Sequence, residues 1–366
     1  MSPTKIVQPY IFSRINKKIQ NRTVLAAMTN KQSLENGVIS DDEIEWLLER
    51  AKGGFGIITT AATNVSKEGK AWDGEFGVYD DCHIPNLTKL TSAIHQTKSL
   101  IIAQLFHGGI KSPQKITGFI PISASEVDCK ESDTGKSKEA TEQDIRKIID
   151  DFTMSAIRCY QAGFDGIELH AAHGYLISQF LGKKINLRND NWGGSLKNRS
   201  RLLVKILKSI RKNVSESFIV GVRISPEIES IGIELNDSIN LINILRKESV
   251  DFIHLSCWDV FVKSHSNINN QKTLTEIITG SYKKLPTIIS TGNVWSSLDA
   301  QNLLKQGADL VGVGRVAIGH PNWANNISNL DYQPKKPPFS IDELKKAKLN
   351  STFISYMKNW NNFVKK

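Results

Sequence analysis

The sequence predicts an α/β fold, a (β/α)8 TIM barrel, and two observations carry this prediction. Eight short apolar runs alternate with segments of helical period, which is the pattern of a parallel sheet covered by helices. The chain has 366 residues, and one decorated barrel accounts for that length because the fold typically takes about 250 residues before insertions. We therefore expect residues 1–366 to form a single barrel domain with a helical extension at about 338–366.

The expected strands are the apolar runs themselves. Each run is short and bounded by polar or glycine-containing segments, as buried parallel strands are. The runs cover residues 24–28, 56–62, 100–106, 164–170, 218–224, 251–256, 287–291 and 310–314.

Helices are expected between the runs, and two of them have clear end signals. Ser40 precedes three acidic residues, an arrangement that caps a helix N-terminus, and Gly163 follows Ala162 as a C-terminal stop. The clearest helical segments are 41–52, 141–162, 199–214 and 237–248.

Two polar segments are too long for simple barrel connections. Residues 111–138 are rich in Ser, Lys and Gly, and residues 260–271 in Asn and Ser, so both are expected to be loop excursions, the first of them a lid. After the eighth run, Pro337-Pro338 ends the barrel part, and residues 340–366 are expected to form one or two closing helices.

Composition narrows the class of protein. The formal charge is +10, and the lysines are spread along the chain, which favours a solvated basic surface over a nucleic-acid groove. The four cysteines form no Cys-x-x-Cys pair, so they are expected to be free thiols. Since no apolar run approaches the roughly 18 residues of a membrane span and the N-terminus has no signal-peptide core, we expect a soluble, cytoplasmic protein.

A candidate site follows the fourth run directly. His170, His173 and Tyr175 lie within six residues where a buried strand is expected to end. Two histidines three residues apart could also bind a metal or serve only the structure. Zinc sites need three or four ligands, and no third ligand stands out in this stretch, so substrate-binding histidines without a metal are favoured.

Polar or glycine residues also end most of the other runs. The carboxyl ends of barrel strands meet at one rim, where active sites of this fold lie. We therefore expect one site to include Thr29, Gln104, His107, His170, His173, Tyr175, Arg223, Gly292, Asn293, Gly314 and Arg315.

The last two runs end in small residues and an arginine. A phosphate held after strands 7 and 8 is the recurrent ligand of this architecture, and Arg315 would supply positive charge. Residues 312–317 also match a dinucleotide-binding G-x-G-x-x-A pattern. No βαβ unit follows it, so that interpretation is set aside. Glycines required only for tight turns remain the alternative.

Gln104 and Arg223 are polar residues inside apolar runs. A buried guanidinium is rarely left unpaired. It needs an anion or a ring with acceptor atoms, and a phosphate-bearing flavin offers both. An internal ion pair with a carboxylate such as Glu168 is the alternative.

Six ordered motifs resemble the Old Yellow Enzyme family of FMN-dependent ene-reductases and NAD(P)H:flavin oxidoreductases. Each motif is modest alone, but their order over about residues 21–323 is specific. They are NRTVLAAMT at 21–29, QLFHGG at 104–109, HAAHGYL at 170–176 with QFL at 179–181, RNDNWGGS at 188–195 with Asn198 and Arg199, VRISP at 222–226, and Gly314-Arg315.

The resemblance implies FMN held noncovalently at the barrel mouth, with NADH or NADPH as reductant. Met28, Thr29, Ala62, Gln104 and Arg223 would then surround the flavin ring, with Arg223 at N1 and O2. The cofactor phosphate would lie at Gly292, Asn293, Gly314 and Arg315.

The catalytic residues that the resemblance implies are three. His170 and His173 would bind the oxygen of an electron-poor alkene, and Tyr175 would protonate the α-carbon of that alkene after hydride transfer. A flavin or quinone reductase or NADH oxidase is the alternative, and a flavin-free phosphate-binding lyase or isomerase is a more distant one. The partner would be a small electron acceptor rather than nucleic acid or membrane, and a homo-oligomer is compatible with the sequence.

Several positions depart from the family pattern and put the substrate preference in doubt. Thr29 argues against the branch with Cys at that position, and Lys31 stands where some relatives have an active-site Tyr. The other departures are Ala27 for Pro, Ile110 for Arg, Gly182-Lys183 for Ser-Pro, and Trp192 for Tyr.

Overall fold

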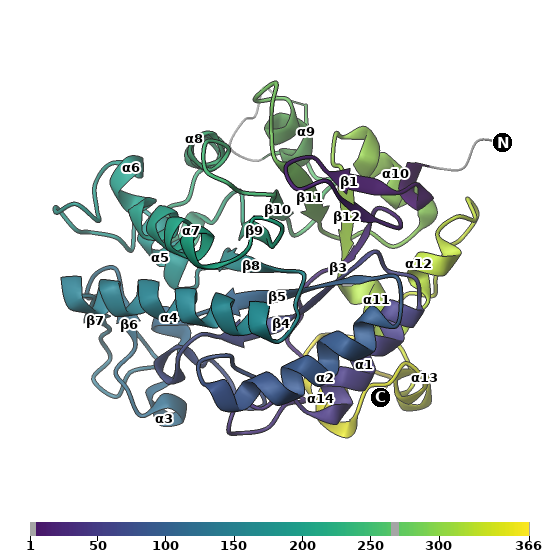
Figure 1. Cartoon of the computed structure of the whole chain (residues 1–366), viewed down its shortest axis with the longest axis horizontal. Helices are drawn as coiled ribbons and strands as arrows, with labels where there is room; N and C mark the ends of the chain where they lie inside the picture. Colours follow the sequence, from purple (N-terminus) through teal and green to yellow (C-terminus); the bar gives the residue numbers. More distant parts are fainter. Residues whose placement is uncertain (1–4, 265–270, 366) are drawn as a thin grey trace.

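Eight parallel strands close into a barrel in the computed structural model, which describes residues 5–264 and 271–365 (Figure 1). The expected TIM barrel is thus confirmed, and each of the eight apolar runs overlaps one of its strands. The strands are β3 (Thr23–Leu25), β4 (Ile57–Asn64), β5 (Leu100–Phe106), β8 (Gly166–Ala171), β9 (Ile219–Ile224), β10 (Phe252–Ser256), β11 (Thr287–Thr291) and β12 (Leu310–Val313).

The strands follow one another around the barrel in chain order, and β12 pairs with β3 to close it. One irregularity interrupts the β4–β5 ladder between Thr59 and Ala62. There the hydroxyl of Thr60 accepts the backbone N–H of Gln104 at 3.1 Å. The shift in register brings Ala62 opposite Gln104, so that both reach the end of the barrel where the site is expected.

Helices alternate with the strands and cover the barrel. The side chain of Ser40 accepts from the N–H of Glu43 and caps α1, as expected. Gly163 follows α4 with φ +85°, the left-handed conformation of a helix stop. The covering helices are α1 (Asp41–Lys52), α2 (Ile84–His95), α4 (Glu142–Gln161), α7 (Arg201–Asn213), α8 (Leu235–Leu245), α9 (Leu274–Thr279), α10 (Ser297–Lys305) and α11 (Arg315–Gly319).

Short helices make up most of the remaining connections. The expected helix at 199–214 is interrupted at Ser200, where one short helix ends and the next begins at Arg201. Arg199 binds the carbonyl of Leu181 and, at 2.9 Å, the carboxylate of Asp237. The short helices are η1 (Lys5–Val7), η2 (Lys67–Gly69), η3 (Asp81–His83), η4 (Gly109–Lys111), α3 (Gln114–Thr117), α5 (Leu176–Leu181), α6 (Leu196–Arg199), η5 (Glu229–Ile231) and α12 (Trp323–Asn326).

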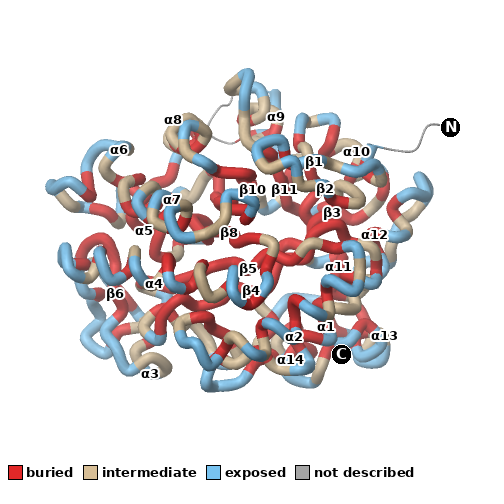
Figure 2. Tube along the Cα trace, viewed as in Figure 1, coloured by how far each residue is buried: buried red, intermediate tan, exposed pale blue. Residues whose placement is uncertain are grey.

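The core has two parts. The larger lies between the strands and the surrounding helices, where Figure 2 shows the buried inner trace beneath exposed outer segments. The smaller lies inside the barrel near the start of the strands. The antiparallel hairpin β1 (Tyr10–Phe12) and β2 (Lys17–Ile19) places Phe12 and Ile19 in this inner part, and Phe12 contacts Phe252 with ring centroids 6.5 Å apart. The hairpin therefore fills the N-terminal end of the barrel.

The segment 111–138 is an excursion, and it ends in a small sheet formed by β6 (Ile122–Ser123) and β7 (Lys138–Glu139). Part of the second expected excursion, residues 265–270 of 260–271, lies outside the described residues. One or two closing helices were expected, and two are present, α13 (Ile341–Lys346) and α14 (Ser351–Met357). Phe353 of α14 packs edge-on against Trp46 of α1, with ring centroids 5.6 Å apart.

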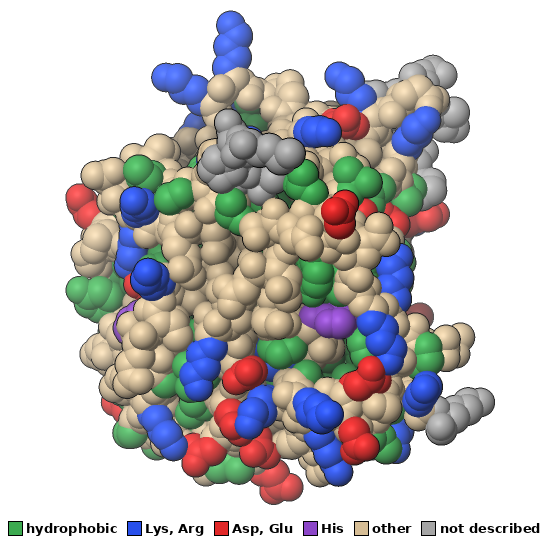
Figure 3. Space-filling model, turned by 90° about the vertical axis from the view of Figure 1, so that its right-hand side faces the viewer, with side chains coloured by type: hydrophobic (Ala, Val, Ile, Leu, Met, Phe, Trp, Pro, Cys, Tyr) green, Lys and Arg blue, Asp and Glu red, His purple; other side chains and the backbone are tan. Residues whose placement is uncertain are grey.

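The surface shows mixed charge. On the face shown in Figure 3, Lys and Arg side chains are scattered and are intermixed with Asp and Glu in the lower part. Within residues 5–264 and 271–365, no helix is long and apolar enough to cross a membrane. The four cysteines are free thiols.

Candidate active site

One large cavity, of about 930 Å³, opens at the carboxyl ends of the barrel strands. All the residues expected to bind the cofactor or to react line it. They are Met28, Thr29, Ala62, Gln104, His170, His173, Tyr175, Arg223, Gly292, Asn293, Gly314 and Arg315. A cavity of this size is typical of small-molecule sites. His107, which also ends a run, is buried beside it but does not belong to its lining.

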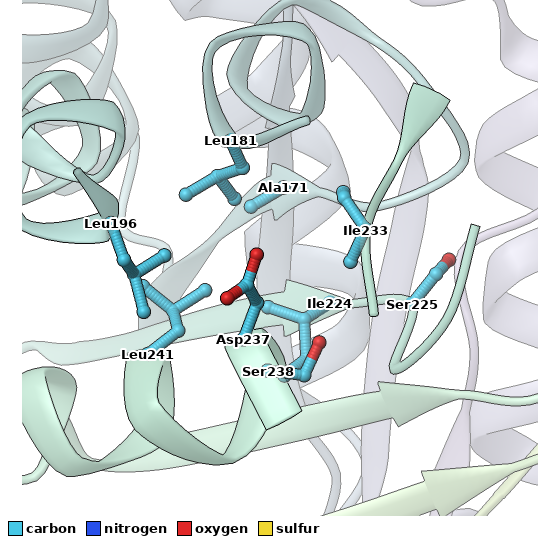
Figure 4. A pocket seen from close by; sticks show the side chains of 9 residues that line it. All are labelled: Ala171, Leu181, Leu196, Ile224, Ser225, Ile233, Asp237, Ser238 and Leu241. Atoms are coloured by element: carbon cyan, nitrogen blue, oxygen red, sulfur yellow. The ribbon is translucent and has the colours of Figure 1, made fainter. Parts of the chain in front are cut away.

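A second cavity lies outside the barrel, between α5, α8 and the strands β8 and β9 (Figure 4). Its volume is about 10 Å³, and side chains such as Leu181, Ile224 and Leu241 line most of it. A space of that size holds about one water molecule. It is therefore a packing defect rather than a ligand site.

The histidine and tyrosine cluster is held by aromatic contacts. Strand β8 carries His170, and His173 follows in a tight turn with φ +59°. The ring of His170 lies edge-on to that of Tyr175 at 4.9 Å, and Phe106 contacts Tyr175 at 4.5 Å. Because these contacts fix the rings, their polar atoms have defined directions into the cavity.

The hydrogen bonds assign a tautomer to both histidines. The backbone N–H of Ala172 donates to Nδ1 of His170 at 3.3 Å, so the proton of His170 is on Nε2. That nitrogen lies 3.2 Å from Nδ1 of His173, which must accept. Nε2 of His173 then donates to the hydroxyl of Ser256 at 2.7 Å. The two imidazoles are therefore hydrogen-bonded to each other.

Burial sets the charge of the cluster. It lowers the pKa of His173 to about 3, with Arg223 and Lys111 acting in the same direction, and it lowers the pKa of His170 well below its ordinary value. Burial also raises the pKa of Tyr175 to about 12. At neutral pH both imidazoles are uncharged and the phenol keeps its proton.

Arg223 is buried at the edge of the cavity, but it does not form the ion pair with Glu168 that was the alternative. Its Nη1 donates to the carbonyl of Ala27 at 3.3 Å and its Nη2 to the hydroxyl of Ser256 at 3.0 Å. Its Nε has no hydrogen-bond partner among the described residues. A buried donor left unpaired costs free energy, so this atom marks a place for an acceptor.

Small residues line the opposite side of the cavity, at the ends of β11 and β12. A Cβ on Gly292 would lie 2.5 Å from the carbonyl oxygen of Cys257, and one on Gly314 would lie 3.1 Å from the sulfur of Met28. Asn293 adopts φ +55° and its side-chain oxygen accepts from Arg315 at 3.2 Å. The Cys257 backbone therefore leaves no room for a side chain at Gly292, and the guanidinium of Arg315 lies beside Asn293 at this side of the cavity.

Several lining residues were missed by the sequence argument. Cys257 and Trp258 directly follow the sixth run, so the strand-end rule applied to that run would have found them. Tyr356 and Trp360 reach the cavity from α14 and the residues after it, and no local pattern indicates how that helix docks. Metal binding gains no support, because the described residues contain no group of three or more His, Cys, Asp or Glu that could hold an ion.

A family model described as the NADH:flavin oxidoreductase / NADH oxidase family matches residues 6–332. The chain belongs to this family. The resemblance to the Old Yellow Enzyme family is thereby confirmed, and the protein is an NAD(P)H:flavin oxidoreductase acting on small molecules.

Individual relatives agree with this assignment. The probable NADH-dependent flavin oxidoreductase YqiG of Bacillus subtilis is 33% identical over 333 residues, covering 88% of this chain and 87% of its own. The NADH:acrylate oxidoreductase of Vibrio harveyi is 34% identical over 85% of this chain, which spans 32% of that longer protein. The structure of the Old Yellow Enzyme homologue from Zymomonas mobilis superposes with a TM-score of 0.81 at 25% identity, covering 94% of this flavin oxidoreductase and 99% of that chain.

Proposed function

We propose that this flavin oxidoreductase uses FMN and NADH or NADPH to reduce electron-poor alkenes, such as α,β-unsaturated carbonyl or nitro compounds. The observation that carries the proposal is the convergence, in one cavity, of an unpartnered arginine Nε, a neutral histidine pair and a protonated tyrosine. The Nε of Arg223 suits the electron-rich edge of a flavin ring. The histidine pair and Tyr175 suit an electron acceptor that must be bound and protonated.

The residues present fit FMN. Arg223 Nε would donate to the pyrimidine edge of the ring, and Gln104 lies on the neighbouring side of the cavity. Met28, Thr29 and Ala62 would line the ring, while Gly292, Asn293, Gly314 and Arg315 would hold the phosphate. FMN, when bound, would carry a hydride from the nicotinamide to the acceptor.

The chain's own groups would bind and protonate the acceptor. An oxygen on the acceptor would take the N–H that His170 now donates to His173, and so orient the alkene. Neutral imidazoles suit this role because they donate without losing a proton. Tyr175, whose pKa is about 12, would hold its proton at neutral pH and pass it to the carbon next to the activating group.

A second candidate activity, flavin or quinone reduction without alkene reduction, is favoured by one observation. His170 and His173 bind each other, and His173 also binds Ser256. An acceptor that did not need the two imidazoles would leave these bonds intact.

The test is the visible spectrum of the protein after addition of FMN and desalting. We expect flavin bands that bleach under anaerobic conditions with NADH or with NADPH. NADH is the reductant in the name of the Bacillus subtilis relative. The bands should return when cyclohexenone is added. Return with a quinone alone would favour the second candidate, and a colourless protein would contradict both.

A further inference from the structure

A buried hydrogen-bond network lies inside the barrel directly behind the cavity. The carboxylate of Glu168, on β8, accepts from Nε2 of Gln104 at 2.6 Å and from Nδ1 of His254 at 2.6 Å. Nε2 of His254 lies 2.7 Å from the hydroxyl of Thr291. Gln104 and Thr291 line the cavity, so the network joins the barrel interior to the site. Nothing in the proposed reaction uses Glu168 or His254.

The charges of the network follow from its contacts. Burial raises the pKa of Glu168, but His254, Arg223 and Gln104 together bring it below its ordinary value, so Glu168 is ionised. Burial lowers the pKa of His254. A neutral His254 with its proton on Nδ1 donates to Glu168 and accepts from Thr291.

The network keeps this negative charge separate from Arg223. Both carboxylate oxygens of Glu168 are engaged by Gln104 and His254, while Arg223 donates to the neutral oxygens of Ala27 and Ser256. In a direct ion pair, the carboxylate of Glu168 would occupy N–H groups of the Arg223 guanidinium. Held apart, Glu168 offsets the positive charge of Arg223 without occupying its N–H groups.

We propose that Glu168 is a positioning residue that fixes Gln104 and sets the flavin reduction potential as a buried counter-charge to Arg223. The inference rests on the proposed binding of FMN. Reduction of bound FMN would add negative charge at the ring edge that Arg223 is proposed to bind, and a fixed carboxylate behind Arg223 would oppose that charge. Glu168 therefore holds the potential below the value that Arg223 alone would give.

The test compares Glu168→Gln with Glu168→Asp in the FMN-loaded protein. Glu168→Gln can keep both contacts, because a Gln amide can donate to Nδ1 of His254 once the imidazole proton moves to Nε2 and faces Thr291. We expect reduced FMN to bind about tenfold tighter relative to oxidised FMN, a rise of about 30 mV for a two-electron couple. Glu168→Asp keeps the charge and should stay near the wild-type potential.

Asp251→Asn is the matched control. Asp251 is a buried carboxylate at the other end of the barrel, bound to Arg14 at 2.6 Å and Arg211 at 2.5 Å. The Asp251→Asn substitution should lower the stability of the protein and leave the flavin reduction potential unchanged. An unchanged potential in Glu168→Gln, or an equal shift in Glu168→Asp or Asp251→Asn, would overturn the inference. Failure of the wild-type protein to bind FMN would overturn it together with the proposed function.

Two further variants apply if Glu168→Gln does not fold. His254→Asn retains a donor to Glu168 and should keep the wild-type potential. His254→Leu removes that donor and frees the carboxylate to approach Arg223, which should lower the potential and weaken FMN binding. Equal potentials in the two His254 variants would contradict the proposal.

Discussion

Tyr175 has the surroundings of a proton donor that ionises only at high pH. Its ring is fixed between Phe106 and His170, and burial raises its pKa to about 12. Because the phenol faces the cavity, its function can be tested separately from hydride transfer to the flavin.

Tyr175→Phe should slow alkene reduction by about 100-fold or more, since general acids typically contribute that much. Flavin reduction by NADH should keep the wild-type rate, because it needs no proton from Tyr175. Stopped-flow measurements of the two half-reactions would separate these effects. Tyr160→Phe, at a half-exposed tyrosine on α4, is the control, and equal enone rates in all three proteins would rule out the assigned role.

The sequence was sufficient to bring the candidate residues together but not to describe their contacts. The strand-end rule and the family motifs placed all twelve in one cavity. The alternative considered for Arg223, an ion pair with Glu168, does not form, and His254 and Gln104 bind that carboxylate instead. Tautomers and pairings depend on which neighbouring strands bring partners such as Ser256, and the sequence order does not give those distances.

At the scale of elements, α14 forms a wall of the cavity although it lies far along the chain. Tyr356 and Met357 line the cavity. Asn350 caps the helix by accepting from the N–H of Phe353 at 2.9 Å. This cap therefore helps to hold the cavity wall, together with the packing of Phe353 on Trp46.

Asn350→Ala should lower the free energy of unfolding by about 1 kcal/mol, the usual effect of losing such a cap. It should also raise the Kd for FMN several-fold, because the wall loosens. Ser340→Ala removes the equivalent cap from α13, which does not line the cavity, and serves as the control. Fluorescence titration with FMN would reveal the difference, and equal Kd values in both variants would argue against a role for α14 in binding.

Elements with a local signal were predicted well, and those without one were missed. All eight strands and helix α1 followed from apolar runs and caps. The β1–β2 hairpin was not foreseen, because strands of three residues carry too little periodicity to be recognised. The closing helices were expected, but their docking depends on contacts such as Phe353 with Trp46.

For the molecule as a whole, the buried histidines make stability depend on pH. Burial lowers the pKa of His107 from 6.5 to about 3, so the folded state stays neutral where the unfolded chain takes up a proton. Stability from this group is complete above about pH 6.5 and is lost as the pH falls toward about 3. Glu43 acts in the opposite sense, since burial raises its pKa to about 7 and its contribution falls as the pH rises from 4.5.

His107→Asn isolates one contribution, since Asn can still accept the N–H of Gly109 that His107 Nδ1 accepts at 3.1 Å. Between pH 6.5 and about pH 5 the wild-type protein should lose about 2 kcal/mol relative to the variant. Urea unfolding at several pH values would measure this difference. Parallel pH profiles for the two proteins would show that His107 does not titrate in this way.

The β1–β2 hairpin has a consequence for the order of events in turnover. By filling the N-terminal end of the barrel with Phe12 and Ile19, it leaves the cavity to be reached from the strand ends where His170 and Arg223 lie. The nicotinamide and the electron acceptor then enter through the same cavity opening and must bind one after the other. Double-reciprocal plots of initial rates should give parallel lines. Excess NADH should inhibit the reaction by competing with the acceptor for the same cavity.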